Sequence, residues 1–156
     1  MSDAARVHRY TVSCRWRGST GAGYDTYDRS HAVEATPAEA MLALSSDPAF
    51  RGDAALLNPE QLLVMAASSC QLLSFLAVAA RARIDVIEYR DDAECEMPED
   101  DPPMRITRIT LRPQIVVGDD LDEARVRHLV EVAHRECFIA SSLKTDVVIE
   151  PEIVRR

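Results

Sequence analysis

The twenty residues from Gln61 to Ala80 carry no charge, and this run limits the possible folds more than any other part of the 156-residue chain. Asn58 and Pro59 come directly before it. An asparagine accepts hydrogen bonds from first-turn amides, and proline at the first helical position loses only an amide that would have no partner. Gln61 completes a capping-box spacing with Asn58. We therefore expect a helix from Pro59 to about Ala82.

This helix is apolar almost all round, which is typical of a central, buried helix. Its length also suits a membrane span, because a bilayer requires about 20 apolar residues. However, polar side chains interrupt it, and the amphipathic segments on either side need a core to pack on. The sequence therefore favours the core of a globular protein. The interrupting residues are Ser68, Ser69, Gln71 and Ser74.

The segments around this helix alternate between apolar and polar residues, which predicts half-buried strands. A second helix should begin near Leu121 and bury a stripe that ends at Cys137. Pro113 indicates an edge strand or a bulge. The order of elements predicts one α+β domain over residues 1–156 with largely antiparallel pairing. The expected strands are Arg9–Arg17, Tyr24–Glu34, Met41–Leu44, Ile87–Met97, Arg105–Val117 and Asp146–Val154.

The charge and the cysteine content exclude several classes of function. With 18 basic and 26 acidic residues the net charge is −8, so we expect no nucleic-acid partner. The N-terminus has no signal-peptide pattern, which leads us to expect a cytoplasmic protein without a membrane partner. Thiols stay reduced in that compartment. The four cysteines and four histidines show no zinc-ligand spacing, so we expect neither a metal nor a cofactor.

The four cysteines differ in their surroundings. Cys14 and Cys95 fall on the apolar faces of expected strands, which predicts inert core thiols. Cys70 lies in the middle of the long helix beside small polar residues. Cys137 ends the second helix and is followed by further small residues. For Cys70 and Cys137 these contexts alone leave both core packing and redox chemistry open.

Four stretches, taken together and in this order, resemble a known superfamily: Trp16–Gly18 with Tyr27–His31, Asp47–Asp53, Asn58 through Cys70, and His134–Ser142. The superfamily is that of osmotically inducible protein C (OsmC) and organic hydroperoxide resistance (Ohr) proteins, and the chain is more similar to an OsmC-like branch. The resemblance implies an OsmC-like fold, with sheets packed around a long central helix, and an intertwined homodimer with active sites at the subunit interface.

The resemblance also implies a cysteine-based peroxidase for organic hydroperoxides. In that role Cys70 is similar to the peroxidatic thiol, Cys137 to the resolving thiol, and Glu60 to the acid that fixes an arginine. Arg29 is the first choice for this arginine and Arg51 the second. The reductant would be a dithiol, which in the Ohr branch is a lipoyl-bearing protein. Many relatives have proline directly after the distal cysteine, where this chain has phenylalanine.

Peroxide cleavage requires a thiolate, and a free thiol with a pKa of about 8.5 is mostly protonated near neutral pH. A guanidinium beside the sulfur would favour the thiolate, and a second thiol would convert the sulfenic acid product to a disulfide. Glu60 and Cys70 are ten residues apart, about 15 Å along a helix. We therefore expect Glu60 to act on the site of the opposite subunit.

Two alternatives remain open. The fold could serve as a small-molecule binding or redox-sensing module whose cysteines oxidise without catalytic cycling. Cys70 could also serve another nucleophilic reaction, such as thioester chemistry.

Overall fold

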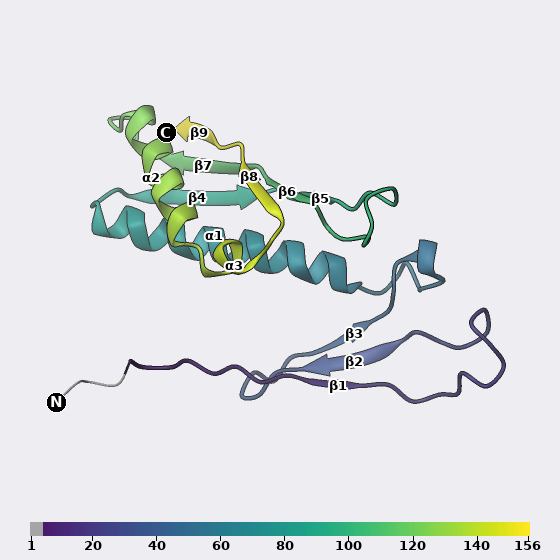
Figure 1. Cartoon of the computed structure of the whole chain (residues 1–156). Coiled ribbons are helices and arrows are strands. Elements are labelled where there is room, and N and C mark those ends of the chain that lie inside the picture. The colour runs from purple at the N-terminus through teal and green to yellow at the C-terminus, as the bar shows by residue number, and fades with distance from the viewer. Residues whose placement is uncertain (1–4) are drawn as a thin grey trace. The chain divides into compact units, whose positions relative to one another are not determined.

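The computed structural model describes residues 5–156. The chain divides into two compact units, the first ending at Gln61 and the second spanning Leu62–Arg156 (Figure 1). Each unit contains sheets of its own, and each is described separately below. The organisation of residues 1–156 as a single domain stays a prediction.

The N-terminal unit contains a three-stranded antiparallel sheet in the order β1-β2-β3. Its strands are β1 (Ser13–Arg15), β2 (His31–Glu34) and β3 (Met41–Leu44). The first two are shorter than predicted. The segment between them forms turns where the second strand was expected to begin, with Gly23 at a φ of 99°. Cys14 lies opposite Val33, and His31 lies opposite Leu44. A short 3₁₀ helix, η1 (Pro48–Phe50), follows the sheet.

The C-terminal unit contains two three-stranded sheets, in the orders β4-β7-β9 and β5-β6-β8. Each long strand expected from the sequence divides into two shorter ones, and the two halves belong to different sheets. The strands are β4 (Val86–Asp91), β5 (Glu94–Glu96), β6 (Arg108–Leu111), β7 (Pro113–Val117), β8 (Asp146–Ile149) and β9 (Glu152–Arg155).

The pairing within the described residues is largely antiparallel, as predicted, but β8 and β9 run parallel to β6 and β7. Pro113 begins the central strand β7, so of the two predicted alternatives, an edge strand or a bulge, the edge strand was wrong. A proline at the first position of a strand costs the sheet little, since the chain is only entering the ladder there. Just before it, the amide of Arg112 donates to Asp91 Oδ1 at 2.7 Å.

The long helix α1 spans Pro59–Arg81, which confirms the prediction from its first turn. The amide of Gln61 donates to Asn58 Oδ1 at 2.8 Å, and the amide of Asn58 donates to Gln61 Oε1 at 3.0 Å. These two bonds form the expected capping box.

By length and hydropathy α1 could cross a membrane, with a mean hydropathy of 2.0. One such helix is weak evidence for a membrane span, because the core helices of soluble proteins meet the same criterion.

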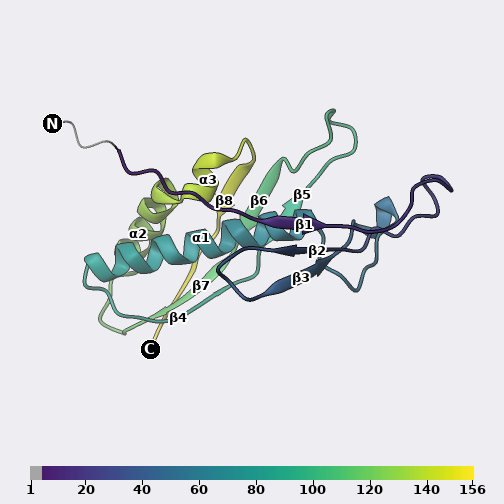
Figure 2. The ribbon, with the colours of Figure 1, turned by 90° about the horizontal axis from the view of Figure 1, so that it is seen from below.

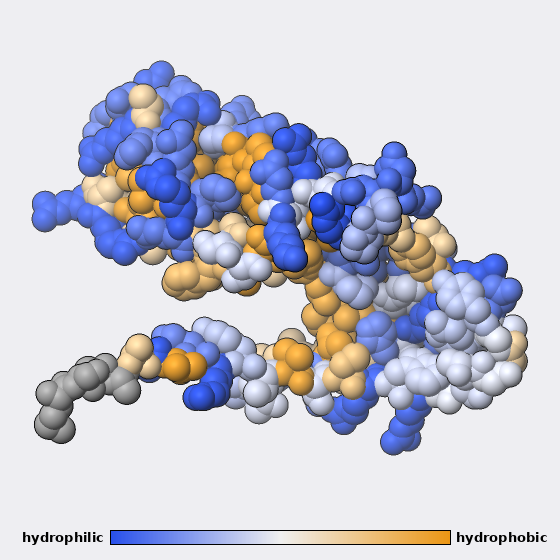
Figure 3. Space-filling view, in the orientation of Figure 1, coloured by the Kyte–Doolittle hydropathy of each residue, from blue (hydrophilic) through white to orange (hydrophobic). Residues whose placement is uncertain are grey.

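One stripe of α1 is buried in the chain, whereas the sequence predicted a central, buried helix. Met65 and Leu73 are 49% and 63% exposed on other sides of the helix. Apolar side chains reach the surface of both units (Figure 3). The buried stripe packs against the β4-β7-β9 sheet and the second helix from Phe75 onward, and against β6 at Ala67. It consists of Ala67, Gln71, Phe75, Val78 and Ala79.

The second helix, α2 (Glu123–Glu136), is followed directly by the short α3 (Phe138–Ser142). Figure 2 shows α2 and α3 on one side of α1, with β4 and β7 on the other. Asp122 caps α2 by accepting from the amide of Ala124 at 3.1 Å. The predicted buried stripe of α2 is confirmed at Val126 and Ala133, which are fully buried. This stripe leads directly to Cys137.

Candidate functional site

The C-terminal unit brings Cys70 and Cys137 together as hydrogen-bonding neighbours. Cys70 projects from the middle of α1 and is half-buried, whereas Cys137 lies between α2 and α3 and is only 1% exposed. Both are free thiols. The two cysteines that the sequence singled out, 67 positions apart, therefore form one thiol pair.

The pKa of Cys70 is lowered although the side chain is partly buried. Burial by itself raises the pKa of a thiol, because it disfavours the charged form. Hydrogen bonds to the sulfur favour the thiolate and outweigh that effect here. The donors are the amide of Ile139, the thiol of Cys137, the amide of Phe138 and the hydroxyl of Ser74.

The pKa of Cys137 is raised, mainly by burial and also by its hydrogen bond to Cys70 and the charge of that sulfur. The amide of Ala140 acts in the opposite direction, donating to Cys137 Sγ at 3.5 Å. The pair therefore consists of one thiol biased toward the thiolate and a neighbour biased toward the protonated form. A lowered pKa is what the attacking nucleophile requires, and a nearby second thiol can resolve the sulfenic acid that forms.

The backbone at Cys137 explains how the amides reach Cys70. Cys137 ends α2 and caps α3 in an extended conformation, with φ −71° and ψ 112°. The first amides of a helix have no partner inside it, so those of Phe138 and Ile139 are available to the Cys70 sulfur. A proline in place of Phe138 would lack this donor. Sequence reasoning missed these backbone donors, although Ser74, four residues after Cys70 on a helix, could have been found from its spacing.

Arg29 lies in the N-terminal unit, where its guanidinium is tightly held. It stacks on the rings of Tyr27 and Tyr24, at 4.0 and 4.7 Å from their centroids. Its terminal nitrogens donate to the carbonyl oxygens of the same two residues, each at 2.7 Å. Two of its five N–H donors are used in this way, which leaves three for a ligand or a sulfur.

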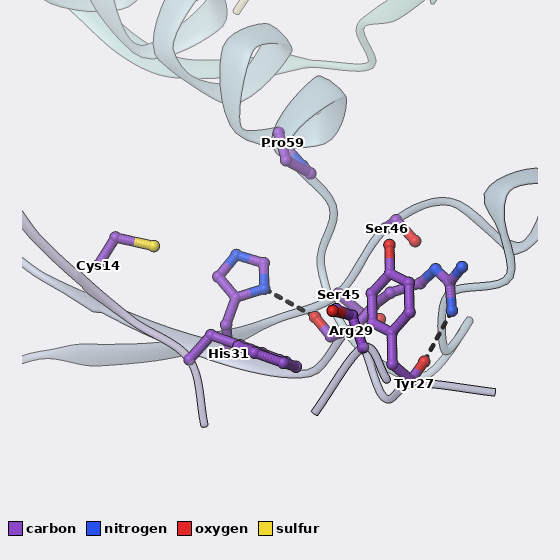
Figure 4. Close-up of a pocket in the computed structure, with 9 residues that line it drawn as sticks. Cys14, Tyr27, Arg29, His31, Ser45, Ser46 and Pro59 are labelled. Carbon is purple, nitrogen blue, oxygen red and sulfur yellow. Dashed lines mark hydrogen bonds between the residues drawn. The ribbon is translucent and has the colours of Figure 1, made fainter. Parts of the chain in front are cut away.

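Arg29 also lines a pocket of about 420 Å³ in the N-terminal unit. Cys14 and His31 project into it from neighbouring strands, and Figure 4 shows both side chains on the same side of the sheet. His31 Nδ1 lies 2.8 Å from the carbonyl oxygen of Arg29. Cys14 is exposed, so its prediction as a core thiol was wrong, whereas Cys95 is half-buried against a hydrophobic cluster.

The other candidate residues also lie in the N-terminal unit. Arg51 forms an ion pair with Asp25 at 2.9 Å and has a left-handed backbone with φ 65°. Glu60 stands in the first turn of α1. Because α1 is continuous from Pro59 to Arg81, Glu60 and Cys70 are separated by about 15 Å along its axis.

Among residues 5–156, no group of three or more His, Cys, Asp or Glu side chains is placed to hold a metal ion.

Comparison with solved structures gives matches over nearly the whole chain. An OsmC-like protein of unknown function from Vibrio cholerae is 27% identical, with a TM-score of 0.83, covering 93% of this chain and 99% of that one. An organic hydroperoxide resistance protein OsmC from Legionella pneumophila is 17% identical, with a TM-score of 0.71 and coverage of 95% and 98%. The organic hydroperoxide resistance protein OhrB of Bacillus subtilis is 21% identical, with a TM-score of 0.63 and coverage of 94% and 98%.

At the level of sequence, no curated protein matches the chain. The profile of the OsmC-like protein family, however, matches residues 52–152. This range includes the whole of α1 and both cysteines of the thiol pair. The α+β architecture with a long helix, expected from the sequence, is shared with the OsmC and Ohr structures. The chain therefore belongs to the OsmC-like family of the OsmC/Ohr superfamily.

Proposed function

We propose that this protein is a cysteine-based peroxidase that reduces organic hydroperoxides. One observation carries the proposal: Cys70 and Cys137 are hydrogen-bonded, and their pKa values are shifted in opposite directions. A lowered pKa supplies the thiolate that attacks a peroxide. A protonated neighbour can then resolve the oxidised product before it is oxidised further. The fold shared with organic hydroperoxide resistance proteins supports the same chemistry.

In the first step the Cys70 thiolate attacks the terminal oxygen of the hydroperoxide. A sulfur–oxygen bond forms as the oxygen–oxygen bond breaks, and the leaving alkoxide takes up a proton and departs as an alcohol. Cys70 is thereby oxidised to a sulfenic acid. The donors around its sulfur, from Ile139, Phe138 and Ser74, favour the thiolate before the attack.

In the second step the Cys137 sulfur attacks the Cys70 sulfur. A disulfide forms, and the hydroxyl of the sulfenic acid leaves with the Cys137 proton as water. An external dithiol, in our proposal of the lipoyl type, then reduces the disulfide and becomes oxidised itself. Because Cys137 is 1% exposed and Cys70 is half-buried, the dithiol attacks at Cys70.

We assign Arg29 to the leaving oxygen and the Cys70 thiolate. Its stacking on Tyr24 and Tyr27 fixes the guanidinium before substrate arrives, so little entropy is lost when it binds an anion. Arg51 is the weaker choice, because Asp25 already pairs with it. In this proposal Glu60 orients the arginine.

The proposed active unit is a homodimer in which Glu60 serves the site of the opposite subunit. Two observations support it. The separation of about 15 Å between Glu60 and Cys70 along α1 is long for one arginine to bridge. The exposed apolar side chains of α1, including Met65 and Leu73, also offer a surface for a second copy of the helix.

These side chains would favour a hydrocarbon substituent over a hydrophilic peroxide. We place the protein in the cytoplasm, where dithiol reductants are present.

A second candidate is a small-molecule binding or redox-sensing module without catalytic cycling. The pocket of about 420 Å³ that holds Arg29 and Cys14 favours it, because its size suits a small organic ligand.

Steady-state turnover separates these two functions. With tert-butyl hydroperoxide and excess dithiothreitol, the peroxidase proposal requires many equivalents of peroxide to be consumed per chain, faster than with hydrogen peroxide. Cys70→Ser should abolish consumption. Cys137→Ser, given peroxide without dithiothreitol, should consume one equivalent and then become inactive, because no second thiol resolves its sulfenic acid. Oxidation of the wild-type cysteines without turnover would instead favour the sensing module.

A further inference from the structure

The hydroxyl of Tyr89 is buried and has no hydrogen-bond partner among the described residues. Tyr89 lies on β4 in the C-terminal unit. A buried hydroxyl without a partner is destabilising by about 1–3 kcal/mol, so native proteins seldom keep one without a reason. A phenylalanine would give the same packing without this cost.

The packing of Tyr89 places it beside the two helices that carry the thiol pair. Its ring lies on that of Phe75, with 5.9 Å between the centroids. Phe75 follows Cys70 by five residues on α1. The same cluster contains Ala133, and Cys137 follows Ala133 by about one helical turn. Tyr89 is thus packed against the elements that position both sulfurs.

The nearby acid, Asp91, is already engaged with other donors. Its Oδ2 accepts from the hydroxyl of Ser68 at 2.5 Å, and its Oδ1 accepts from the amide of Arg112 at 2.7 Å. Burial, the charge of Asp91 and the charge of Cys137 all raise the pKa of Tyr89. The phenol therefore stays protonated and remains a donor.

We propose that Tyr89 is a positioning residue of the resolving thiol, and that its hydroxyl donates a hydrogen bond to the Cys137 sulfur when that sulfur carries negative charge. The inference rests on the proposed function, because Cys137 develops this charge at two points in the cycle. It does so as its proton passes to the hydroxyl leaving Cys70, and again as the leaving thiolate when the dithiol attacks the disulfide.

A buried thiolate needs more donors than Cys137 has at rest, where the amide of Ala140 is one. A hydroxyl that donates only to the charged form lowers the pKa of the thiol, and its removal raises that pKa. Ionisable groups on the elements around Cys137 include Cys70 on α1, Asp91 on β4, His134 on α2, and the Arg81–Glu136 ion pair between α1 and α2.

The test uses Tyr89→Phe, which keeps the ring on Phe75 and removes only the hydroxyl. In a Cys70→Ser background, the pH dependence of Cys137 alkylation is followed by peptide mass spectrometry, with no peroxide present. We expect the midpoint to rise by about one pH unit, a tenfold loss of thiolate at a fixed pH below it. Tyr10→Phe, at an 89% exposed tyrosine, is the matched control and should leave the midpoint in place. An unchanged midpoint in Tyr89→Phe overturns the inference.

A second readout uses the full thiol pair. After one equivalent of tert-butyl hydroperoxide, Tyr89→Phe should form the Cys70 sulfenic acid at the wild-type rate but the disulfide about tenfold more slowly. Equal disulfide rates would contradict the role of Tyr89. If wild-type Cys70 is not oxidised at all, the proposed function fails, whereas the Cys137 titration still decides whether Tyr89 acts on that thiol.

Discussion

The thiol of Cys137 donates a hydrogen bond to the sulfur of Cys70, although 67 positions separate them in sequence. Burial is the main cause of the raised pKa of Cys137, and this contact adds to it; the same contact helps the amide of Ile139 to lower the pKa of Cys70. The rate of Cys70 oxidation should therefore rise with pH and reach its plateau at a lower pH than for an ordinary thiol. Cys137, in contrast, keeps its proton through that range and is available to resolve the product.

The amide of Phe138 should be measurable as a thiolate donor. Phe138→Pro removes this N–H, and the extended backbone of Cys137 suits a following proline. Because a hydrogen bond to a charged group contributes about 1.5–3 kcal/mol, we expect the pKa of Cys70 to rise by about one unit. The measurement is the pH dependence of Cys70 alkylation, followed by peptide mass spectrometry.

Phe138→Ala is the matched control, because it keeps the amide and removes a side chain that is 82% exposed. Its Cys70 should titrate as in the wild type. If the proline and alanine variants give the same midpoint, the amide of Phe138 does not stabilise the thiolate.

Arg29→Lys should slow Cys70 oxidation by organic hydroperoxide at least about tenfold, measured by stopped-flow kinetics. Lysine keeps the charge but loses the planar group that stacks on Tyr27 and the fork that donates to two carbonyl groups. Arg51→Lys is the control and should change the rate little, because Arg51 pairs with the exposed Asp25. If Arg51→Lys slows Cys70 oxidation more than Arg29→Lys does, Arg51 and not Arg29 is the arginine that acts on the Cys70 thiolate.

The sequence predicted α1 almost to the residue, because its start depends on local contacts between Asn58, Pro59 and Gln61. It did not predict that the strand after Arg105 would divide at Arg112 and enter a second sheet. Alternation of apolar residues continues across that break, and which sheet each half joins depends on distant partners such as β8 and β9.

The candidate site shows the same division between local and distant causes. Cys70 and Cys137 were identified from sequence contexts that a family resemblance connected. The backbone amides of Phe138 and Ile139, which donate to the Cys70 sulfur, were not identified. Every residue except proline carries an amide, so the sequence does not mark these two. They point at the sulfur only because the chain changes direction at Cys137. Tyr89 falls within the strand expected over Ile87–Met97, and alternation along a strand does not show whether a tyrosine hydroxyl has a hydrogen-bond partner.

Subunit complementation should decide how Glu60 acts. Chains carrying Glu60→Gln and chains carrying Cys70→Ser are each expected to be impaired as homodimers. If Glu60 serves the opposite subunit, a mixed dimer has one site with both wild-type residues, and mixing should restore up to about a quarter of wild-type activity by random pairing. The measurement is hydroperoxide turnover after co-refolding. No recovery in a mixture shown to contain mixed dimers would mean that Glu60 acts within its own chain.

Gly52→Ala should destabilise the loop that carries Arg51 and Gly52. An added Cβ would lie 1.6 Å from the backbone oxygen of Ser46, and the Gly52 amide donates to the carbonyl oxygen of Asp47 at 3.0 Å. We expect a loss of about 2 kcal/mol or more in the free energy of unfolding, measured by denaturant titration.

Gly118→Ala is the control, since its nearest contact is a side-chain oxygen of Asp120 at 3.2 Å, which can move. If the two variants have the same free energy of unfolding, the backbone around Ser46 can move to accommodate the added Cβ at little energetic cost.

The central claim, that Cys70 and Cys137 form one redox pair, is tested most directly by peptide mass spectrometry of the reduced protein after one equivalent of an organic hydroperoxide. The account predicts a Cys70–Cys137 disulfide as the main product, with Cys14 and Cys95 still reduced. Retention of both thiols, or a disulfide that involves Cys14 or Cys95 instead, would contradict it.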